Sequence, residues 1–317
     1  MPTLLPSDPP ISPTNRVMSD TPDSYWDSVL SMLHTRIGIP SEHSRRLPMG
    51  KSPVFRVGVD GILKLIPPYW AEDAAREVAA LQIVPPGGPV ETPGVLVVDM
   101  VDGWTVLLMR CLPGHILREV WPTLDHEERA DLALQLGRIA AWLHQLHIPE
   151  SSPLVYDWAT HLASAQQSIV AEFAQADTPA ALRASWPAFV QAVGPMPSAG
   201  DPLVLLHGDL SAANLLVERD EGRWRITGLL DFGDASLGQG IHDWLSPGVH
   251  DFRGDRALLE AFCAGYGLPS SNRTSAFQAQ LLARTVLYYG WRFLERRFPI
   301  QQATTWDDVA RTVWPLA

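Results

Sequence analysis

Apolar and polar positions over the first third of the chain predict two short β-hairpins. Two pairs of apolar runs each flank an Asp-Gly dipeptide: Val54–Val59 with Gly61–Ile66, and Val95–Met100 with Trp104–Met109. Such a dipeptide between apolar runs favours a tight turn, because glycine adopts positive φ angles without strain. We therefore expect four strands that are joined in pairs.

A helical period lies between the two hairpins. Within residues 70–84, Trp70, Ala74, Val78 and Leu81 recur at the spacing of one helix face. A further strand is expected before Gly50. The order strand-strand-strand-helix-strand-strand predicts a small antiparallel sheet that carries one helix.

The chain after Gly114 has the pattern of a mainly helical region. Asp125 and Glu128 form a capping-box pattern, which marks the start of a helix. The buried stripe of this helix is predicted to contain Leu132, Leu136, Ile139, Leu143 and Leu146. Further helices are predicted at 158–175, 179–193, 256–266 and 275–297, with a strand pair at 203–206 and 215–218 and a last strand at 224–230.

This change of pattern divides the chain into two lobes of an α+β fold. We assign residues 23–109 to a β-rich N-terminal lobe, 110–114 to a hinge and 115–317 to a helical C-terminal lobe. Residues 1–22 are rich in Pro, Ser, Thr and Asp and contain no basic segment followed by an apolar one. They therefore predict a disordered leader and a cytoplasmic protein.

Composition and charge narrow the choice of partners. The chain has 317 residues, of which 46% are apolar and 19% charged, and it contains no run of about 18 uncharged apolar residues, so no membrane span is expected. The formal charge of −11 disfavours nucleic acid, whose phosphates would be repelled. It suits a cationic small molecule, although solubility alone would also explain it.

Acidic and amide residues follow two apolar strands in the second half of the chain. Asp209 and Asn214 lie on a loop after Val204–Leu206, and Asp231 follows a strand that ends at Leu230. Phosphoryl transfer to a hydroxyl requires an acceptor for the proton and hard oxygen ligands for the metal ions on the phosphates. We therefore interpret Asp209 as the catalytic base, and Asn214 and Asp231 as catalytic residues that bind Mg²⁺.

These motifs carry a resemblance to a known family. His207-Gly208-Asp209, with Asn214 five residues after the aspartate and Asp231-Phe232-Gly233 downstream, resembles the aminoglycoside phosphotransferase and choline kinase group. The resemblance covers roughly residues 24–316 and implies a bilobal protein-kinase-like fold with ATP and Mg²⁺ as cofactors. Within the group the chain looks most like hygromycin B 7″-O-phosphotransferases. The stretches that carry this closer likeness are 25–27, 52–54, 64–70, 249–259 and 307–314.

The resemblance also implies a lysine on the third strand that pairs with a glutamate on the following helix. Lys64 is one of only two lysines in the chain and would hold the α- and β-phosphates, a task for which a flexible point charge is suited. Glu77 would pair with it, with Glu72 as a competing candidate and an exposed helix acid as the simpler interpretation.

Other site residues follow from the same resemblance. The backbone at Ser52 would cover the phosphates, and Met109, Arg110 and Leu112 would bind the purine at the hinge. His207 would brace the catalytic loop.

One further acid, Asp243, also matches a position of the family, and another, Asp234, lies three residues after Asp231. Asp243 would hydrogen-bond the backbone of the catalytic loop. Asp234 either contacts a cationic substrate, as the catalytic Asp209 would, or caps a turn.

The substrate class is inferred from positions at which this sequence differs from the motifs of protein kinases. Gly208 replaces the arginine that would clamp a phosphorylated segment, Ser211 stands where many Ser/Thr kinases have lysine, and no Ala-Pro-Glu segment follows Asp231. A small hydroxylated molecule is therefore preferred, and the charge favours an aminoglycoside. The alternatives are a kinase for choline, a sugar, a macrolide or an amino alcohol, and an inactive nucleotide-binding regulator. The sequence leaves open ATP or GTP, monomer or homodimer, and which hydroxyl is phosphorylated.

Overall fold

The computed structural model describes residues 5–11, 17–40, 43–48, 50–149, 152–175, 178–194 and 202–316. The chain forms two compact units, the first comprising Met1–Pro113 and Leu230–Asp234, and the second Gly114–Leu229 and Ala235–Ala317. The division after Pro113 falls inside the segment interpreted above as a hinge. The return of Leu230–Asp234 to the first unit was not expected from the sequence.

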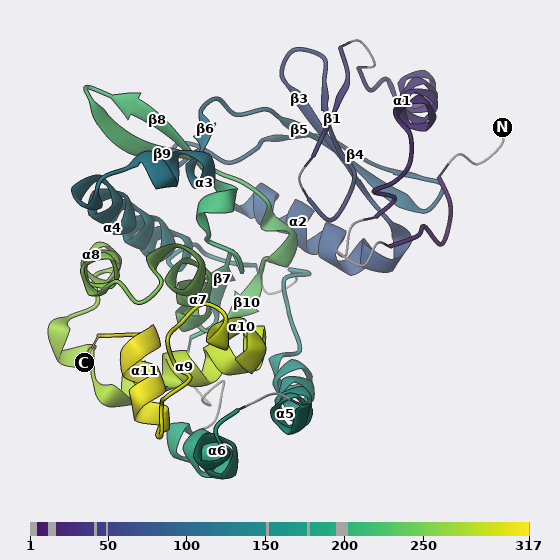
Figure 1. Cartoon of the computed structure of the whole chain (residues 1–317). Helices are drawn as coiled ribbons and strands as arrows, with labels where there is room; N and C mark the ends of the chain where they lie inside the picture. Colours follow the sequence, from purple (N-terminus) through teal and green to yellow (C-terminus); the bar gives the residue numbers. More distant parts are fainter. Residues whose placement is uncertain are drawn as a thin grey trace. The chain divides into compact units, whose positions relative to one another are not determined.

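The first unit contains a five-stranded antiparallel sheet with the strand order β1-β2-β3-β5-β4 (Figure 1). Its elements are α1 (Asp23–Ile37), β1 (Arg45–Leu47), β2 (Val54–Val57), β3 (Gly61–Ile66), η1 (Pro68–Trp70), α2 (Ala71–Ile83), β4 (Val95–Val101), β5 (Trp104–Arg110) and the short η4 (Phe232–Asp234). Both predicted hairpins are present, because β2 pairs with β3 and β4 with β5. The predicted strand before Gly50 and the helix over 70–84 are confirmed as β1 and α2.

The helix α1 covers one face of this sheet and was missed by the sequence interpretation, which expected a single helix in this lobe. Trp26, Val29 and Leu33 on α1 are at most 1% exposed and belong to one hydrophobic core with Phe55 and Leu63 of the sheet. Their i, i+3, i+7 spacing is that of an amphipathic helix face, so the signal was present in the sequence.

The leader also differs from its prediction as a disordered segment. Of its described residues, Leu5 is 2% and Val17 1% exposed, and both belong to the same core as α1. The indole N–H of Trp104 donates a 2.7 Å hydrogen bond to the carbonyl of Pro6. Scattered apolar residues within a Pro-rich segment thus find a hydrophobic surface that the local composition does not reveal.

The second unit is mainly helical and holds two small sheets, with strand orders β6-β8-β9 and β10-β7. Its first elements are β6 (His115–Ile116), α3 (Leu117–Val120), η2 (Trp121–Thr123), α4 (His126–Leu143), α5 (Trp158–Gln175), α6 (Ala180–Val193), β7 (Val204–Leu206), η3 (Ala212–Asn214), β8 (Leu215–Asp220) and β9 (Arg223–Leu229). They are followed by β10 (Ser236–Gly238), η5 (Gly240–Trp244), α7 (Leu245–Pro247), η6 (Gly248–Phe252), α8 (Arg256–Tyr266), η7 (Ser270–Asn272), α9 (Ser275–Tyr289), α10 (Trp291–Glu295) and α11 (Trp306–Val313).

The long helix α4 starts as predicted and packs tightly against α8. Asp125 and Glu128 form the expected capping box. A Cβ on Gly137 would lie 2.2 Å from the carbonyl oxygen of Phe262, and one on Gly265 would lie 2.0 Å from that of Leu134. The two helices therefore approach so closely that only glycine fits at these points.

Two details of the second unit correct the sequence interpretation. The predicted pairing of 203–206 with 215–218 is wrong, since β7 pairs with β10 and β8 with β9. Glu221 and Gly222 have φ angles of 48° and 83°, and such a two-residue turn joins β8 directly to β9. The helix predicted over 275–297 breaks at Gly290, where φ is 83°, and α11 was not predicted.

Within the described residues, no helix is both long and apolar enough to cross a lipid bilayer.

Candidate active site

The first unit places one ammonium group between two carboxylates. Lys64 Nζ lies 2.9 Å and 2.8 Å from the two carboxylate oxygens of Glu77, and 2.8 Å from Asp231 Oδ1. The Glu77 side chain is 2% exposed, that of Lys64 15% and that of Asp231 51%. The cluster is thus closed on its Glu77 side and open to solvent on its Asp231 side.

Local structure explains how these three side chains meet. Successive residues of a strand point to opposite faces, so Lys64 points away from the core that Leu63 and Leu65 enter with 0% exposure. Glu77 lies on the buried stripe of α2 with Ala74 and Leu81. Asp231 has a φ of 60°, a left-handed conformation that is uncommon for residues other than glycine. Backbone strain of this kind is concentrated at functional sites.

Electrostatics favours the charged form of Lys64. Burial acts to lower its pKa, but the adjacent charges and hydrogen bonds of Asp231 and Glu77 outweigh burial and raise the pKa above its ordinary value. Lys64 therefore stays an ammonium group in the folded chain. Burial raises the pKa of Glu77, with Lys64 opposing that effect and Asp231 adding to it.

Lys64 and Glu77 form the pairing that the family resemblance implied. Glu72, the competing candidate, is exposed on the first turn of α2. Asp234 is exposed, lies in the first unit with Asp231, and adds to the raised pKa of Glu77. Its contact with a substrate stays a prediction.

The residues predicted to bind the purine and the phosphates lie at the ends of strands of the first sheet: Ser52 precedes β2, Met109 and Arg110 end β5, and Leu112 follows β5. Ser52 and Met109 are each 6% exposed, Arg110 is exposed and Leu112 is half-buried. The Arg110 N–H donates to the carbonyl of Gly94 over 2.8 Å. Because Lys64 pairs with Leu107 across β3 and β5, strand alternation puts Met109 on the Lys64 face and the Arg110 side chain on the other. The nucleotide contacts of all four residues stay predictions.

A cavity of about 270 Å³ in the first unit is lined by Val57, Leu108 and Arg110 among others. Leu108 pairs with Leu63, so this cavity lies on the face opposite Lys64. It is therefore separate from the charged cluster.

The second unit holds Asp209 on the loop between β7 and β8. The Asn214 side-chain N–H₂ group donates to Asp209 Oδ2 and to the Asp209 carbonyl, each over 2.9 Å. The hydroxyl of Ser246 donates to Asp209 Oδ1. Both carboxylate oxygens are therefore held by neutral donors, and Asn214 Oδ1 is not used in these contacts.

Asp243 fixes the backbone of the same loop. Its carboxylate accepts hydrogen bonds from the backbone N–H groups of His207 over 2.9 Å and Gly208 over 2.8 Å. Gly208 has a φ of 86° and adopts this conformation without strain. His144 Nε2 lies 3.1 Å from Asp243, and its Nδ1 lies 2.8 Å from the hydroxyl of Tyr266. This geometry agrees with the role that the resemblance implied for Asp243.

The pKa of Asp243 reflects these contacts. Burial alone would raise it, but the hydrogen bond and charge of His144 and the contacts with His207 hold it below its usual value. His207 is fully buried, and its Nδ1 lies 3.2 Å from the backbone N–H of Asp209. The arrangement suits a bracing role for His207, because its ring contacts the loop from within the core.

The sequence interpretation missed three residues that contact the loop or its brace: Ser246, Asp251 and His144. Asp251 accepts a 2.9 Å hydrogen bond from the backbone N–H of Ala212. Burial raises the pKa of Asp251 to about 7, and the nearby charge of Asp209 adds to that effect. No local pattern identified Ser246 or Asp251, because their partners lie more than 30 residues away in sequence.

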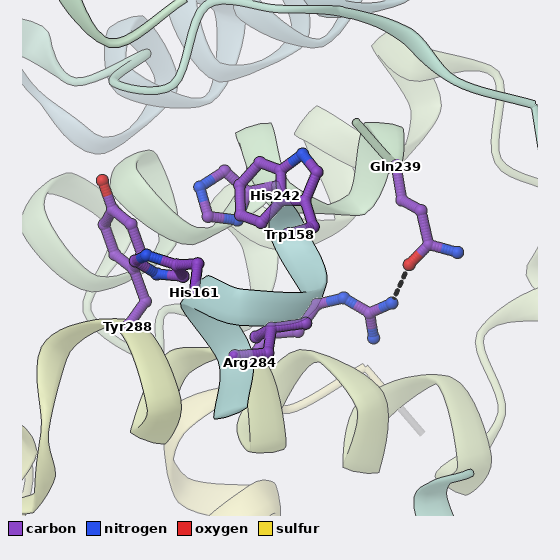
Figure 2. A pocket seen from close by; sticks show the side chains of 7 residues that line it. Trp158, His161, Gln239, His242, Arg284 and Tyr288 are labelled. Atoms are coloured by element: carbon purple, nitrogen blue, oxygen red, sulfur yellow. Dashed lines mark hydrogen bonds between the residues drawn. The ribbon is translucent and has the colours of Figure 1, made fainter. Parts of the chain in front are cut away.

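A separate cavity of the second unit lies among α5, η5 and α9 (Figure 2). Its rings pack edge to face, with His242 4.6 Å from Trp158 and 4.8 Å from Tyr288 between ring centroids. None of the described residues that line it is acidic, and Arg284 donates a hydrogen bond to Gln239 there. Its volume of about 30 Å³ is room for about two water molecules. It is therefore too small for a purine or a sugar ring.

Several solved structures share this fold. Aminoglycoside 2'-phosphotransferase-IIIa in its GDP complex matches with a TM-score of 0.62 and 19% identity, over 85% of this chain and 94% of that one. The streptomycin–ATP ternary complex of APH(2")-IIa matches with a TM-score of 0.59 and 18% identity, over 85% and 95%. Macrolide 2'-phosphotransferase MphH from Brachybacterium faecium matches with a TM-score of 0.55 and 23% identity, over 91% and 98%. These matches confirm the kinase-like fold that the sequence predicted.

Among curated proteins, the lysine-specific demethylase JMJ21 of Arabidopsis thaliana is 28% identical over 143 residues. The match covers 36% of this chain and 15% of that protein. Residues 43–277 match the family described as "Phosphotransferase enzyme family". This region contains both polar clusters, the one around Lys64 and the one around Asp209, and the chain accordingly belongs to that phosphotransferase enzyme family.

Proposed function

We propose that this phosphotransferase transfers the γ-phosphate of ATP to a hydroxyl group of a small molecule, with Asp209 as the base. The observation that carries the proposal is the hydrogen-bonded pair of Asp209 and Asn214 on a loop whose backbone is fixed by Asp243. A carboxylate fixed in this way is ready to accept a proton without reorganisation, which is what positioned general-base catalysis requires.

The chemistry assigned to these residues is a single displacement. As the acceptor oxygen forms a bond to the γ-phosphorus, its proton passes to the Asp209 carboxylate. The bond between the γ-phosphorus and the oxygen that bridges to the β-phosphate breaks, and ADP leaves. Asp209 then returns the proton to solvent.

The donor set fits magnesium. Asn214 offers an amide oxygen and Asp231 a carboxylate, and Mg²⁺ prefers hard oxygen ligands of this kind together with phosphates. Mg²⁺ held by such ligands would neutralise charge on the phosphates. Lys64, kept charged by Glu77 and Asp231, would hold the α- and β-phosphates. Ser52, Met109, Arg110 and Leu112 are proposed to contact the rest of the nucleotide.

The preferred acceptor is an aminoglycoside, with hygromycin-like compounds first because of the sequence likeness noted above. The formal charge of −11 supports a cationic acceptor, and solved neighbours are named as complexes with kanamycin, streptomycin and gentamicin. The described residues that line the cavity of Figure 2 include Arg284 and no carboxylate, so we do not assign the cationic acceptor to it. Asp209 and Asp234 are therefore the proposed cationic-substrate contacts.

A second candidate is a metabolite or macrolide kinase of the same fold. Neighbours at similar TM-scores are named as a macrolide 2'-phosphotransferase and a microcompartment-associated aminopropanol kinase. An inactive nucleotide-binding regulator is disfavoured, because the chain contains all five residues assigned above to nucleotide binding and catalysis: Lys64, Glu77, Asp209, Asn214 and Asp231.

The test is a screen of ADP or GDP release in the presence of Mg²⁺. The acceptor panel comprises hygromycin B, kanamycin, streptomycin, a macrolide, choline and aminopropanol, with Asp209→Asn as the control for background hydrolysis. Turnover of an aminoglycoside supports the preferred acceptor. Turnover of another alcohol alone rejects it and leaves phosphotransfer standing. Nucleotide binding without turnover of any acceptor or of water would favour the regulator.

A further inference from the structure

One irregular helical segment runs through η5, α7 and η6 and contacts the catalytic loop at several points. The 3₁₀ turn η5 leads into α7, and η6 is a π-helical turn. Residues three apart on a helix share a face. Asp243 and Ser246 have this spacing, and both side chains contact the loop. The Asp243 carboxylate accepts hydrogen bonds from the loop backbone, and the Ser246 hydroxyl donates to the Asp209 side chain.

Packing on the other side holds this segment in place. The ring of Trp244 lies 4.8 Å from that of Phe262 and 5.4 Å from that of Phe277. A Cβ on Gly248 would lie 2.0 Å from the indole of Trp314, so the backbone touches that ring directly. Ser246 is only 1% exposed between these contacts. Packing therefore fixes the backbone position from which the Ser246 hydroxyl extends.

The bond from Ser246 to Asp209 is of a strong kind. A hydroxyl that donates to a carboxylate makes a charge-assisted hydrogen bond, about twice as strong as a neutral one. Asn214 donates to the other oxygen, Oδ2. The two donors come from different parts of the chain: Asn214 lies on the loop itself, and Ser246 lies on α7. Together they define the plane of the carboxylate.

We infer that Ser246 is a positioning residue for phosphoryl transfer, which sets the orientation of the Asp209 carboxylate toward the acceptor hydroxyl. The inference rests on the proposed role of Asp209 as base. A serine hydroxyl is both donor and acceptor, so it can turn to accept when Asp209 takes the acceptor's proton on Oδ1. An alanine at this position leaves the carboxylate held from one side only.

The first experiment compares Ser246→Ala with Ser236→Ala. Ser236 is a matched control, since it is a buried serine of the second unit at 4% exposure on β10. Activity is ADP release from ATP and Mg²⁺, with the acceptor found in the screen and with water as acceptor. We expect Ser246→Ala to lower kcat by about 10- to 100-fold, as for loss of a hydrogen bond to a charged group. KM for ATP, KM for the acceptor and Tm should change little, and Ser236→Ala should stay within about twofold of wild type in kcat.

Two further variants separate positioning from packing. Ser246→Thr keeps the hydroxyl and should recover most of the lost kcat, while Ser246→Cys, a weak donor of similar shape, should fall between Thr and Ala. In an Asp209→Asn background, Ser246→Ala should cause little further loss, because residues that act as a unit are non-additive. A full additional loss in that background would mean that Ser246 acts independently of Asp209.

The outcomes distinguish this inference from the function on which it rests. If Asp209→Asn turns over at nearly the wild-type rate, the proposed function is rejected. If Asp209→Asn is impaired but Ser246→Ala keeps normal kcat, only the positioning role is rejected. A fall in kcat matched by a fall in Tm in both Ser246→Ala and Ser246→Cys would also reject it in favour of a purely structural role.

Discussion

The two polar clusters of the molecule are held together by different forces. In the first unit, an ammonium group is fixed by two carboxylates, so charge is balanced by charge. In the second unit, the carboxylate of Asp209 is fixed by an amide and a hydroxyl, and that of Asp243 by two backbone N–H groups and His144. The first cluster is an ion pair network, while the second is mainly a set of hydrogen bonds to anions.

This difference indicates what each cluster is suited to do. An ion pair that is already balanced keeps Lys64 charged and in place for the phosphate contact proposed above. The Asp209 carboxylate is held by two neutral donors, which leave its negative charge uncompensated, so it can attract a proton or cations. Mutations of the first cluster should therefore act mainly on stability and nucleotide binding, and mutations of Asp209 in the second unit mainly on kcat.

The largest effect is expected for Asp209→Asn. The amide keeps the shape of the side chain but cannot accept the proton, so kcat should fall by a factor on the order of 10² to 10⁴ with nucleotide affinity nearly unchanged. Steady-state kinetics and nucleotide titration measure the two quantities. Asp220→Asn, at an exposed position on β8, is the matched control. A kcat near that of the control would remove Asp209 from the role of base.

Glu77→Gln should act on stability. Removing one partner of a buried ion pair leaves a charge poorly compensated, which costs about 3 kcal/mol. We expect the free energy of unfolding in urea to fall by about that amount and KM for ATP to rise. Glu72→Gln, on the same helix but exposed, should change stability by less than about 0.5 kcal/mol. Equal effects of the two variants would contradict the ion-pair account.

Asp243→Asn should have a smaller effect that appears in both quantities. The amide has only one acceptor oxygen, so its N–H₂ group faces one of the two backbone N–H groups from which the carboxylate accepts hydrogen bonds. We expect a loss of about 2 kcal/mol in the free energy of unfolding and a roughly tenfold lower kcat, because the loop backbone shifts. Unchanged kcat in a destabilised variant would separate the brace from catalysis.

The smallest effect concerns the pH dependence of Asp251. Its pKa is raised to about 7 in the folded chain, so the unfolded chain releases this proton at lower pH. The contribution of Asp251 to stability therefore falls as pH rises from its ordinary pKa through about 7. Asp251→Asn keeps an acceptor for Ala212 and removes this dependence. The variant's Tm relative to wild type should be higher at pH 8 than at pH 6, by the equivalent of about 1.4 kcal/mol, because one pH unit separates pH 6 from the pKa of about 7. The same difference at both pH values would show that Asp251 does not titrate in this range.

Local patterns predicted much of the fold. Asp-Gly turns marked both hairpins of the first sheet, and the capping box marked the start of α4, because these features depend on residues close in sequence. The pairing of β7 with β10 was missed for two reasons. β10 has only three residues, and β8 and β9 lie between the two strands in the sequence. A strand so short carries no alternation to recognise.

The sequence predicted those residues of the candidate site that stand in a recognisable motif, and missed those that do not. Asp209, Asn214 and Asp231 stand in a recognisable spacing, and Lys64 was singled out because lysine is scarce in this chain. The pairing of Glu77 rather than Glu72 was resolved by geometry. Ser246 and Asp251 become visible only when the α7 segment is packed against the loop, since serine and aspartate are common residues and tertiary contacts leave no local trace.

The return of Leu230–Asp234 to the first unit has a consequence for synthesis on the ribosome. Lys64 and Asp231 are 167 residues apart in sequence. At about 5–20 residues per second, roughly 8–30 s separate their translation. During that interval Lys64 has Glu77 as its partner but Asp231 has not been made. The first unit therefore cannot complete its charged cluster as the chain emerges, and a fragment that ends at Pro113 would lack the residue that completes it.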